Sequence, residues 1–206
     1  MNTINERDIV AEAEIRAAFG EPEGCKIIYT FEENRYIHTI RPQDRQEWLN
    51  IVNIKDMCIF QRYNLVFESC IFKTEISFNR ATFNTILRFK KCIFNHHVLS
   101  YEATFYSISF EKECVFRESV NFDFSTFNGE LCCIDATFEG VVCFGSNFNQ
   151  NVRFSMCCFK KAVFFSESTF KQNVFFEETT FEKGVHFGDL LLKGTFNSIG
   201  KMEEDS

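Results

Sequence analysis

Three stretches, ATFNTILRF (residues 81–89), STFKQNVFF (168–176) and TTFEKGVHF (179–187), decide the fold of this chain. In each stretch a first Phe stands two positions after a small residue. A second Phe follows six residues later and stands two positions after Leu or Val. From residue 67 onward such Phe residues follow one another in alternating steps of five and six, so the unit is 11 residues long. Side chains at i and i+2 share a face of a strand but not of a helix. The pattern therefore predicts short strands with inward-facing Phe.

The 11-residue unit itself alternates, which doubles the period to 22 residues. In one set of Phe positions the residue two places earlier is Cys, Ala or Thr, and in another set it is Ala or Ser. The first set comprises Phe72, Phe94, Phe116, Phe138, Phe159 and Phe181, and the second comprises Phe83, Phe105, Phe127, Phe148 and Phe170. A period of 22 predicts four short sides per coil, with equivalent residues stacked about 4.8 Å apart on successive coils. The rings would then meet along one axis and exclude water.

Two short steps and two substitutions interrupt this pattern. The steps 105–110 and 144–148 are each one residue shorter than expected, and we interpret them as deletions at corners of the coil. Ser100 and Cys133 stand where Phe is expected, which predicts weaker packing at these two points.

Phe positions with a small residue two places earlier, repeating about every five residues, resemble the pentapeptide-repeat family. The resemblance covers residues 58–196 and departs from the strict five-residue form by one extra residue in alternate sides. It implies an all-β solenoid, a right-handed quadrilateral β-helix, here of about six coils with a small N-terminal helix/hairpin cap.

Residues 1–57 do not repeat and are predicted to form that cap. A capping-box pattern from Thr3 to Glu6 opens an expected helix that runs through Phe19. Residues 26–31 and 36–40 then read as a short hairpin. Because a solenoid exposes apolar ends, a structural lid is the simpler interpretation, and an independent partner-binding element is the alternative. Residues 197–206 are expected to form an acidic tail.

Charge is spread unevenly along the chain. The formal net charge is −7, yet residues 58–196 hold 15 acidic and 14 basic residues, so the rod is nearly neutral. Basic bands at 73–91 and 153–171 enclose an acidic belt at 111–139. We consider the acids of this belt a candidate partner-binding surface: Glu111, Glu113, Glu118, Asp123, Glu130, Asp135 and Glu139.

The sequence offers no recognisable catalytic set. It contains no Gly-rich phosphate loop, no GxSxG and no HExxH motif, so we expect neither an enzyme nor a bound cofactor or metal. The ten Cys include no CxxC pair and no export signal precedes them, which predicts thiols in a cytoplasmic protein. Stacked Cys could in principle form disulfides, but small buried apolar residues are the simpler interpretation. His96 and His97 are expected to be ordinary corner residues.

The C-terminal coils carry unusual outward apolar residues. Phe164 and Phe175 each precede an inward Phe, and a Leu run occupies Leu190, Leu191 and Leu192. This pattern predicts a homodimer interface at the C-terminal coils, and packing under residues 193–206 is the alternative.

Two functional hypotheses follow. The first is a non-catalytic protein-interaction module, a rigid rod that presents a banded charged surface to a protein partner of unknown identity. The second, implied by the family resemblance, is a DNA mimic that binds bacterial type II topoisomerase (DNA gyrase) and gives quinolone protection. Mimicry needs a sustained negative surface, so the near-neutral rod favours the first hypothesis. We expect no direct nucleic-acid binding, and no apolar run is long enough for a transmembrane segment.

Overall fold

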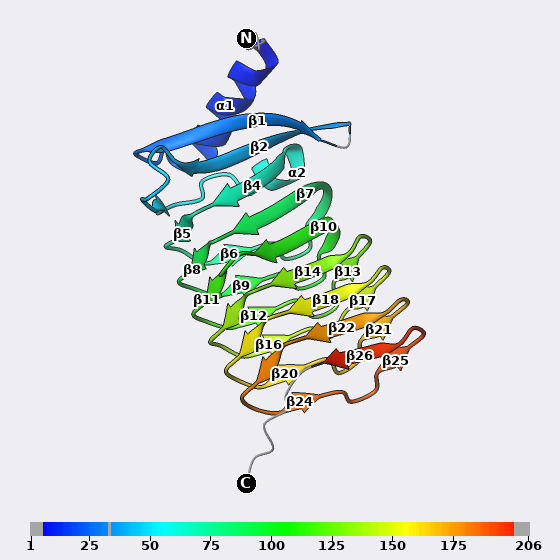
Figure 1. Cartoon of the computed structure of the whole chain (residues 1–206). Coiled ribbons are helices and arrows are strands. Elements are labelled where there is room, and N and C mark those ends of the chain that lie inside the picture. Colours follow the sequence, from blue (N-terminus) through cyan, green and yellow to red (C-terminus); the bar gives the residue numbers. More distant parts are fainter. Residues whose placement is uncertain (1–5, 33, 200–206) are drawn as a thin grey trace.

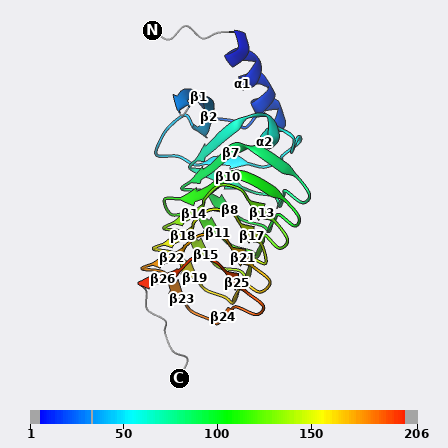
Figure 2. The ribbon, with the colours of Figure 1, turned by 90° about the vertical axis from the view of Figure 1, so that its right-hand side faces the viewer.

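The computed structural model describes residues 6–32 and 34–199, which form a rod of stacked coils with a helix and a hairpin at one end (Figure 1). The predicted fold class is confirmed: the chain is an all-β solenoid, a right-handed β-helix with few helices. It has about seven coils rather than six, since one side is a sheet of seven parallel strands. Figure 2 shows the helix projecting beyond the hairpin while the coils stack toward the C-terminus.

The N-terminal helix and hairpin are where the sequence predicts them. Helix α1 (Glu6–Ala18) is followed by Gly20, which has a φ of +72° and donates its N–H to the Ala17 carbonyl at 3.1 Å. Strands β1 (Cys25–Glu32) and β2 (Arg35–Pro42) pair antiparallel. The predicted capping residue Thr3 lies outside the described residues, as does most of the expected acidic tail.

The extra coil comes from residues expected in the cap. Strand β2 pairs in parallel with β4 (Asn64–Glu68), and β3 (Leu49–Ile51) pairs in parallel with β5 (Cys70–Phe72). Between β3 and β4 the chain passes through α2 (Ile59–Arg62). The strands of this first coil bury Ile and Leu, and its buried Phe60 lies in α2, so the Phe spacing could not reveal it.

The predicted four sides are present, and we call them a, b, c and d in chain order. Side a holds β5, β8 (Ile93–Phe94), β11 (Val115–Phe116), β15 (Thr137–Phe138), β19 (Cys158–Phe159) and β23 (Thr180–Phe181). Side b holds β6 (Ile76–Ser77), β9 (Val98–Leu99), β12 (Val120–Asn121), β16 (Val142–Cys143), β20 (Val163–Phe164) and β24 (Val185–His186).

Sides c and d belong to one larger sheet. Strands β7 (Thr82–Lys90) and β10 (Thr104–Glu111) run through both sides without a break. Later coils divide them into side c, with β13 (Thr126–Phe127), β17 (Asn147–Phe148), β21 (Thr169–Phe170) and β25 (Leu191–Leu192). Side d continues with β14 (Leu131–Ile134), β18 (Val152–Ser155), β22 (Val174–Glu177) and β26 (Phe196–Ile199).

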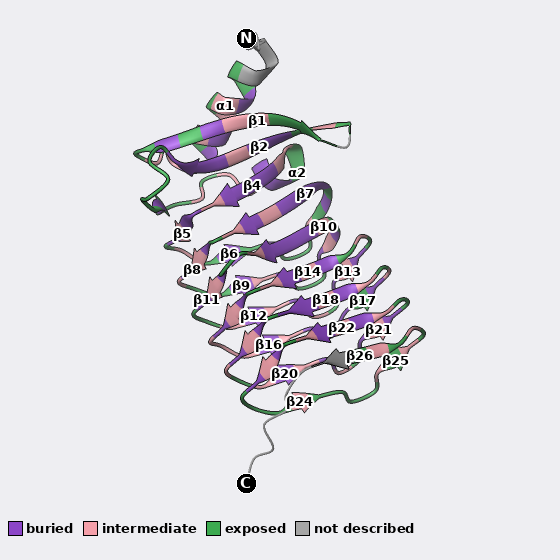
Figure 3. Ribbon diagram, viewed as in Figure 1, coloured by how far each residue is buried: buried purple, intermediate pink, exposed green. Residues whose placement is uncertain are grey.

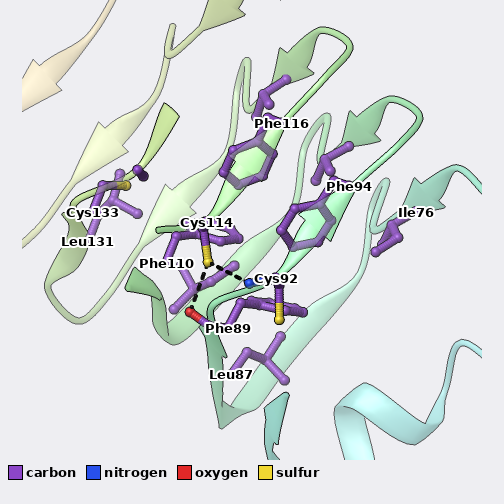
Figure 4. Close-up of a cluster of buried hydrophobic side chains, with 14 of the residues drawn as sticks. Ile76, Leu87, Phe89, Cys92, Phe94, Phe110, Cys114, Phe116, Leu131 and Cys133 are labelled. Carbon is purple, nitrogen blue, oxygen red and sulfur yellow. Dashed lines mark hydrogen bonds between the residues drawn. The ribbon is translucent and has the colours of Figure 1, made fainter. Parts of the chain in front are cut away.

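Phe rings stack in files inside the rod, as the 22-residue period predicts. On side a, Phe94 lies 4.5 Å from Phe116 between ring centroids, with planes 4° apart (Figure 4). On side c, Phe127 lies 5.3 Å from Phe105 and 4.9 Å from Phe148. Figure 3 shows buried positions alternating with less buried ones along the strands. At the N-terminal end Phe19 packs edge-on against Phe67 at 5.3 Å, so the helix closes the core there.

The alternation of five-residue and six-residue steps between inward Phe positions has a structural cause at the corners of the coil. Each five-residue step at the d–a corner or the b–c corner contains one residue with positive φ. At the d–a corner these residues are Ser69, Lys91, Asp135, Met156 and Glu178, and at the b–c corner they are Arg80, Glu102, Phe124, Glu167 and Asp189. A left-handed residue turns the chain sharply, so these corners need one residue fewer.

Both predicted deletions lie at corners. The step 144–148 lacks the left-handed residue of the b–c corner altogether. The step 105–110 falls within β10, where the register with β7 shifts, and the next corner regains a residue because Lys112 and Glu113 both have positive φ. Ser100 is fully buried with no hydrogen-bond partner for its hydroxyl, in keeping with the weaker packing predicted there.

The small residue before each Phe also has a polar role. The Cys114 thiol donates to the Phe89 carbonyl at 3.3 Å (Figure 4), and the Cys157 thiol donates to the Cys133 carbonyl at 3.3 Å. On side c, the Ser168 hydroxyl donates to the Phe144 carbonyl at 2.6 Å. Each bond satisfies a buried carbonyl of the preceding coil, where an unpaired acceptor would be costly.

Candidate interaction surfaces

The seven acids of the predicted belt encircle the rod instead of forming one patch. Three of them form ion pairs with bases of neighbouring coils: Glu111 with Lys90 at 3.8 Å, Glu130 with Arg153 at 3.7 Å and Glu139 with Lys160 at 2.8 Å. Asp123 is half-buried and accepts a hydrogen bond from the Gly145 N–H at 2.9 Å. Glu113 and Asp135 are exposed at the d–a corner of successive coils, and Glu118 is exposed at the a–b corner. Partner binding by the whole belt stays a prediction.

The residues of the predicted dimer interface are divided among different parts of the rod. Phe164 faces outward on side b and stacks on His186, with ring centroids 4.5 Å apart. Phe175 lies on side d beneath the Arg153 guanidinium, 4.7 Å from its ring centroid. Leu190 and Leu192 pack against the core, whereas Leu191 is 50% exposed. The five residues therefore do not form one continuous patch.

The last coil has its own apolar surface. In this coil Phe187 is 39% exposed and Leu191 is 50% exposed, and the Phe187 ring stacks on Phe165 with centroids 5.5 Å apart. Among residues 6–32 and 34–199, no further strand pairs with the outer edges of β23, β24, β25 or β26. Sequence reasoning missed Phe187 because the repeat assigns it to the core, although no following coil covers it.

A notch interrupts the b–c corner where the left-handed residue is deleted. Its volume is about 340 Å³, and we define the side-b notch by its lining residues: Asp123, Phe124, Cys143, Gly145, Phe164, Ser166 and Glu167. Phe124 above it is 55% exposed and meets the ring of Tyr101 edge-on at 5.3 Å. In the sequence, only the short step 144–148 indicates the side-b notch, and a deletion alone does not show that a hollow will remain.

The deletion also removes a hydrogen-bond donor. In complete corners, the N–H of the left-handed residue donates to the coil below, from Phe124 to the Gly145 carbonyl at 2.6 Å and from Glu167 to the Gly188 carbonyl at 2.9 Å. The missing residue would make the same bond to the Ser166 carbonyl. That acceptor is therefore left at the notch without its corner donor.

Buried cysteines are poor candidates for chemistry. Burial raises the pKa of the Cys92, Cys114 and Cys133 thiols well above their usual value, and raises that of Cys157 to about 12. Nucleophilic attack and metal binding both need the thiolate, which these groups do not form near neutral pH. All ten cysteines are free. The described residues include no group of His, Cys, Asp and Glu side chains that could hold a metal ion.

Fold and surface together define a repeat solenoid with a closed core and irregular corners. Residues 144–190 match the family model for pentapeptide repeats (9 copies), which confirms the resemblance to the pentapeptide-repeat family. The same coil geometry continues on the N-terminal side of the matched residues. No curated protein and no solved structure matches the chain. Neither of the described helices is both long enough and apolar enough to cross a membrane.

Proposed function

We propose that this protein is a non-catalytic interaction rod whose protein partner docks on side b, with one side chain inserted in the side-b notch. The observation that carries this proposal is the exposed Phe124 at the rim of a hollow in an otherwise regular corner. The ten free cysteines support a cytoplasmic setting, where thiols stay reduced.

Phe124 occupies a position that other coils give to polar residues. Its φ is +59°, a conformation that is rare for a bulky aromatic residue. The equivalent residues in complete corners are Arg80, Glu102, Glu167 and Asp189. Solubility would favour a charged residue here as well, so the exposed ring indicates binding, in which aromatic residues contribute most of the energy.

The chemistry of the notch indicates the partner. Phe124 and Phe164 provide aromatic walls, and Asp123 and Glu167 bring negative charge to the same opening. The Ser166 carbonyl adds an acceptor that no backbone N–H of the described corner residues reaches. An Arg or Lys side chain suits all three features, because its stem packs on aromatic rings and its head donates to carboxylates and carbonyls. The proposed partner therefore presents a basic side chain within an apolar surface.

Filling the notch should abolish binding without harming the rod. Insertion of Asn between Gly145 and Ser146 restores the five-residue step, and Asn tolerates the left-handed conformation. We expect affinity capture from lysate, followed by quantitative mass spectrometry, to recover a partner with the natural protein and at least tenfold less with the insertion variant. Phe31→Ser serves as a control, because Phe31 is 61% exposed on the distant hairpin. Equal recovery by all three proteins would refute docking at the notch.

DNA mimicry receives less support from the surface. Glu111, Glu130 and Glu139 are neutralised by Lys90, Arg153 and Lys160, so the belt lacks a row of free carboxylates. A topoisomerase groove that binds phosphates would meet paired charges and intervening bases. We therefore retain the interaction rod as the proposed function.

We also propose that a second copy of the chain covers the C-terminal end of the rod. Phe187 and Leu191 are exposed there, and Val185 and Phe196 are half-buried beside them. We expect sedimentation velocity at micromolar concentration to show a dimer that Leu191→Glu converts to a monomer, because a charge would be buried in the interface. A monomeric natural protein at these concentrations would eliminate this proposal.

A further inference from the structure

A second hollow lies at the d–a corner near the hairpin, and it shares no lining residue with the side-b notch. Its volume is about 320 Å³, and five basic side chains line it: Arg41, Arg45, Lys90, Lys91 and Lys112. Two carboxylates, Glu68 and Glu113, line it as well, so positive charge is in excess by three.

Arg41 is the unusual member of this set. Its side chain lies at the end of β2 and is only 7% exposed. One terminal nitrogen, Nη1, donates to the Pro42 carbonyl at 3.0 Å, but its Nε has no hydrogen-bond partner. Arg41 forms no ion pair within the described part of the chain. A buried cation without a counter-ion is costly, so the surroundings of Arg41 call for an anion.

Stacking of successive coils brings the other cations to Arg41. Glu68, Lys90 and Glu111 are neighbours across β4, β7 and β10, and the Ser69 N–H donates to the Lys90 carbonyl at 3.0 Å. Lys112 and Glu113 both have positive φ in the corner that regains a residue, and both line the hollow. The irregular step after β10 therefore helps to build this hollow, as the deletion builds the side-b notch.

Nearby groups neutralise only part of this charge. Lys90 forms a long ion pair with Glu111 at 3.8 Å, and the Lys91 ammonium lies 5.6 Å from the Trp48 ring centroid. Arg45 and Lys112 form no ion pair with any described residue. The Trp48 ring is neutral, so Lys91 also has no counter-ion among the described residues. Four cations thus remain available to one ligand, and the two guanidinium groups among them suit oxyanions with several oxygens.

We propose that this hollow binds the phosphate group of a small phosphate monoester. A tetrahedral dianion matches the excess of cations better than a single carboxylate does. Nucleic acid or a membrane surface would need positive charge along an extended face. In the following coils the d–a corner carries Asp135, Met156 and Glu178, none of which is basic. The basic surface therefore ends at this hollow.

The test uses inorganic phosphate and then a mononucleotide with the full-length protein. Isothermal titration should show saturable phosphate binding with a dissociation constant below about 1 mM, and chloride at equal ionic strength should not replace it. We expect Arg41→Met and Lys112→Gln to weaken this binding at least tenfold. Lys171→Gln, a change of an exposed lysine at the c–d corner, should leave it unchanged.

A second readout separates binding from a structural role of Arg41. In phosphate-free buffer Arg41→Met should melt at the same temperature as the natural protein or higher, because an uncompensated buried charge is removed. Phosphate should then raise the melting temperature of the natural protein only. Lack of saturable binding, or an equal effect of chloride, would overturn the proposal. Competition between the mononucleotide and phosphate would identify the carrier as a free small molecule, whereas competition only by a phosphoserine peptide would contradict a small-molecule ligand.

Discussion

Phe127→Ala is expected to destabilise the rod by about 3–5 kcal/mol, the largest effect of any single change considered for this chain. Phe127 is 1% exposed at the middle of the side-c file, and its ring stacks on Phe105 and Phe148. The parallel sheets on either side hold the backbone in place, so the cavity left by the ring cannot collapse fully.

Chemical denaturation with a matched variant measures this effect. Phe124→Ala removes a ring of the same size from the same turn of the chain, but that ring is 55% exposed. We expect it to change the free energy of unfolding by less than about 1 kcal/mol. Similar effects of the two variants would show that Phe127 does not face a closed core.

Gly140→Ala is expected to cost about 1–3 kcal/mol, because two coils approach each other too closely for a side chain. A Cβ on Gly140 would lie 2.4 Å from the carbonyl carbon of Glu118 and 2.5 Å from the Ser119 nitrogen. These are backbone atoms of the preceding coil, so the strands of sides a and b would have to move apart.

Gly184→Ala is the natural control for this second prediction. Its Cβ would meet only the flexible His186 side chain, at 3.4 Å. We expect this variant to be neutral or slightly stabilising, since Ala restricts the unfolded chain more than Gly. Thermal melting that ranks the two variants in the opposite order would contradict the coil spacing described above.

Phe spacing predicted much of the fold for a simple physical reason. An inward residue in a stacked coil must match the residue above and below it, so positions such as Phe94 and Phe116 repeat with the geometry. The first coil escaped prediction because Ile40 and Ile51 stand in the core where the next coil has Phe67 and Phe72. One hydrophobic residue can replace another at these positions as long as the core remains filled.

Candidate sites were predicted less well, because they depend on which corners meet in space. The sequence predicts correctly that Phe164 faces outward, yet it places Phe164 and Phe175 together although they lie on different sides. The cluster around Arg41 joins residues up to 72 positions from it in the sequence, and only the stacked corners bring them together. The sequence predicts that both short steps are deletions at corners, but it does not predict that the step 144–148 leaves a hollow beside Phe124.

Site-specific photocrosslinking tests the proposed docking surface most directly. Benzoylphenylalanine at Tyr101 would place a reactive ring beside Phe124, and the same group at Met156 would lie at the exposed d–a corner. We predict that irradiation in cells links a protein partner to the variant at 101 and not to the variant at 156. Crosslinks at 156 with none at 101 would contradict docking on side b.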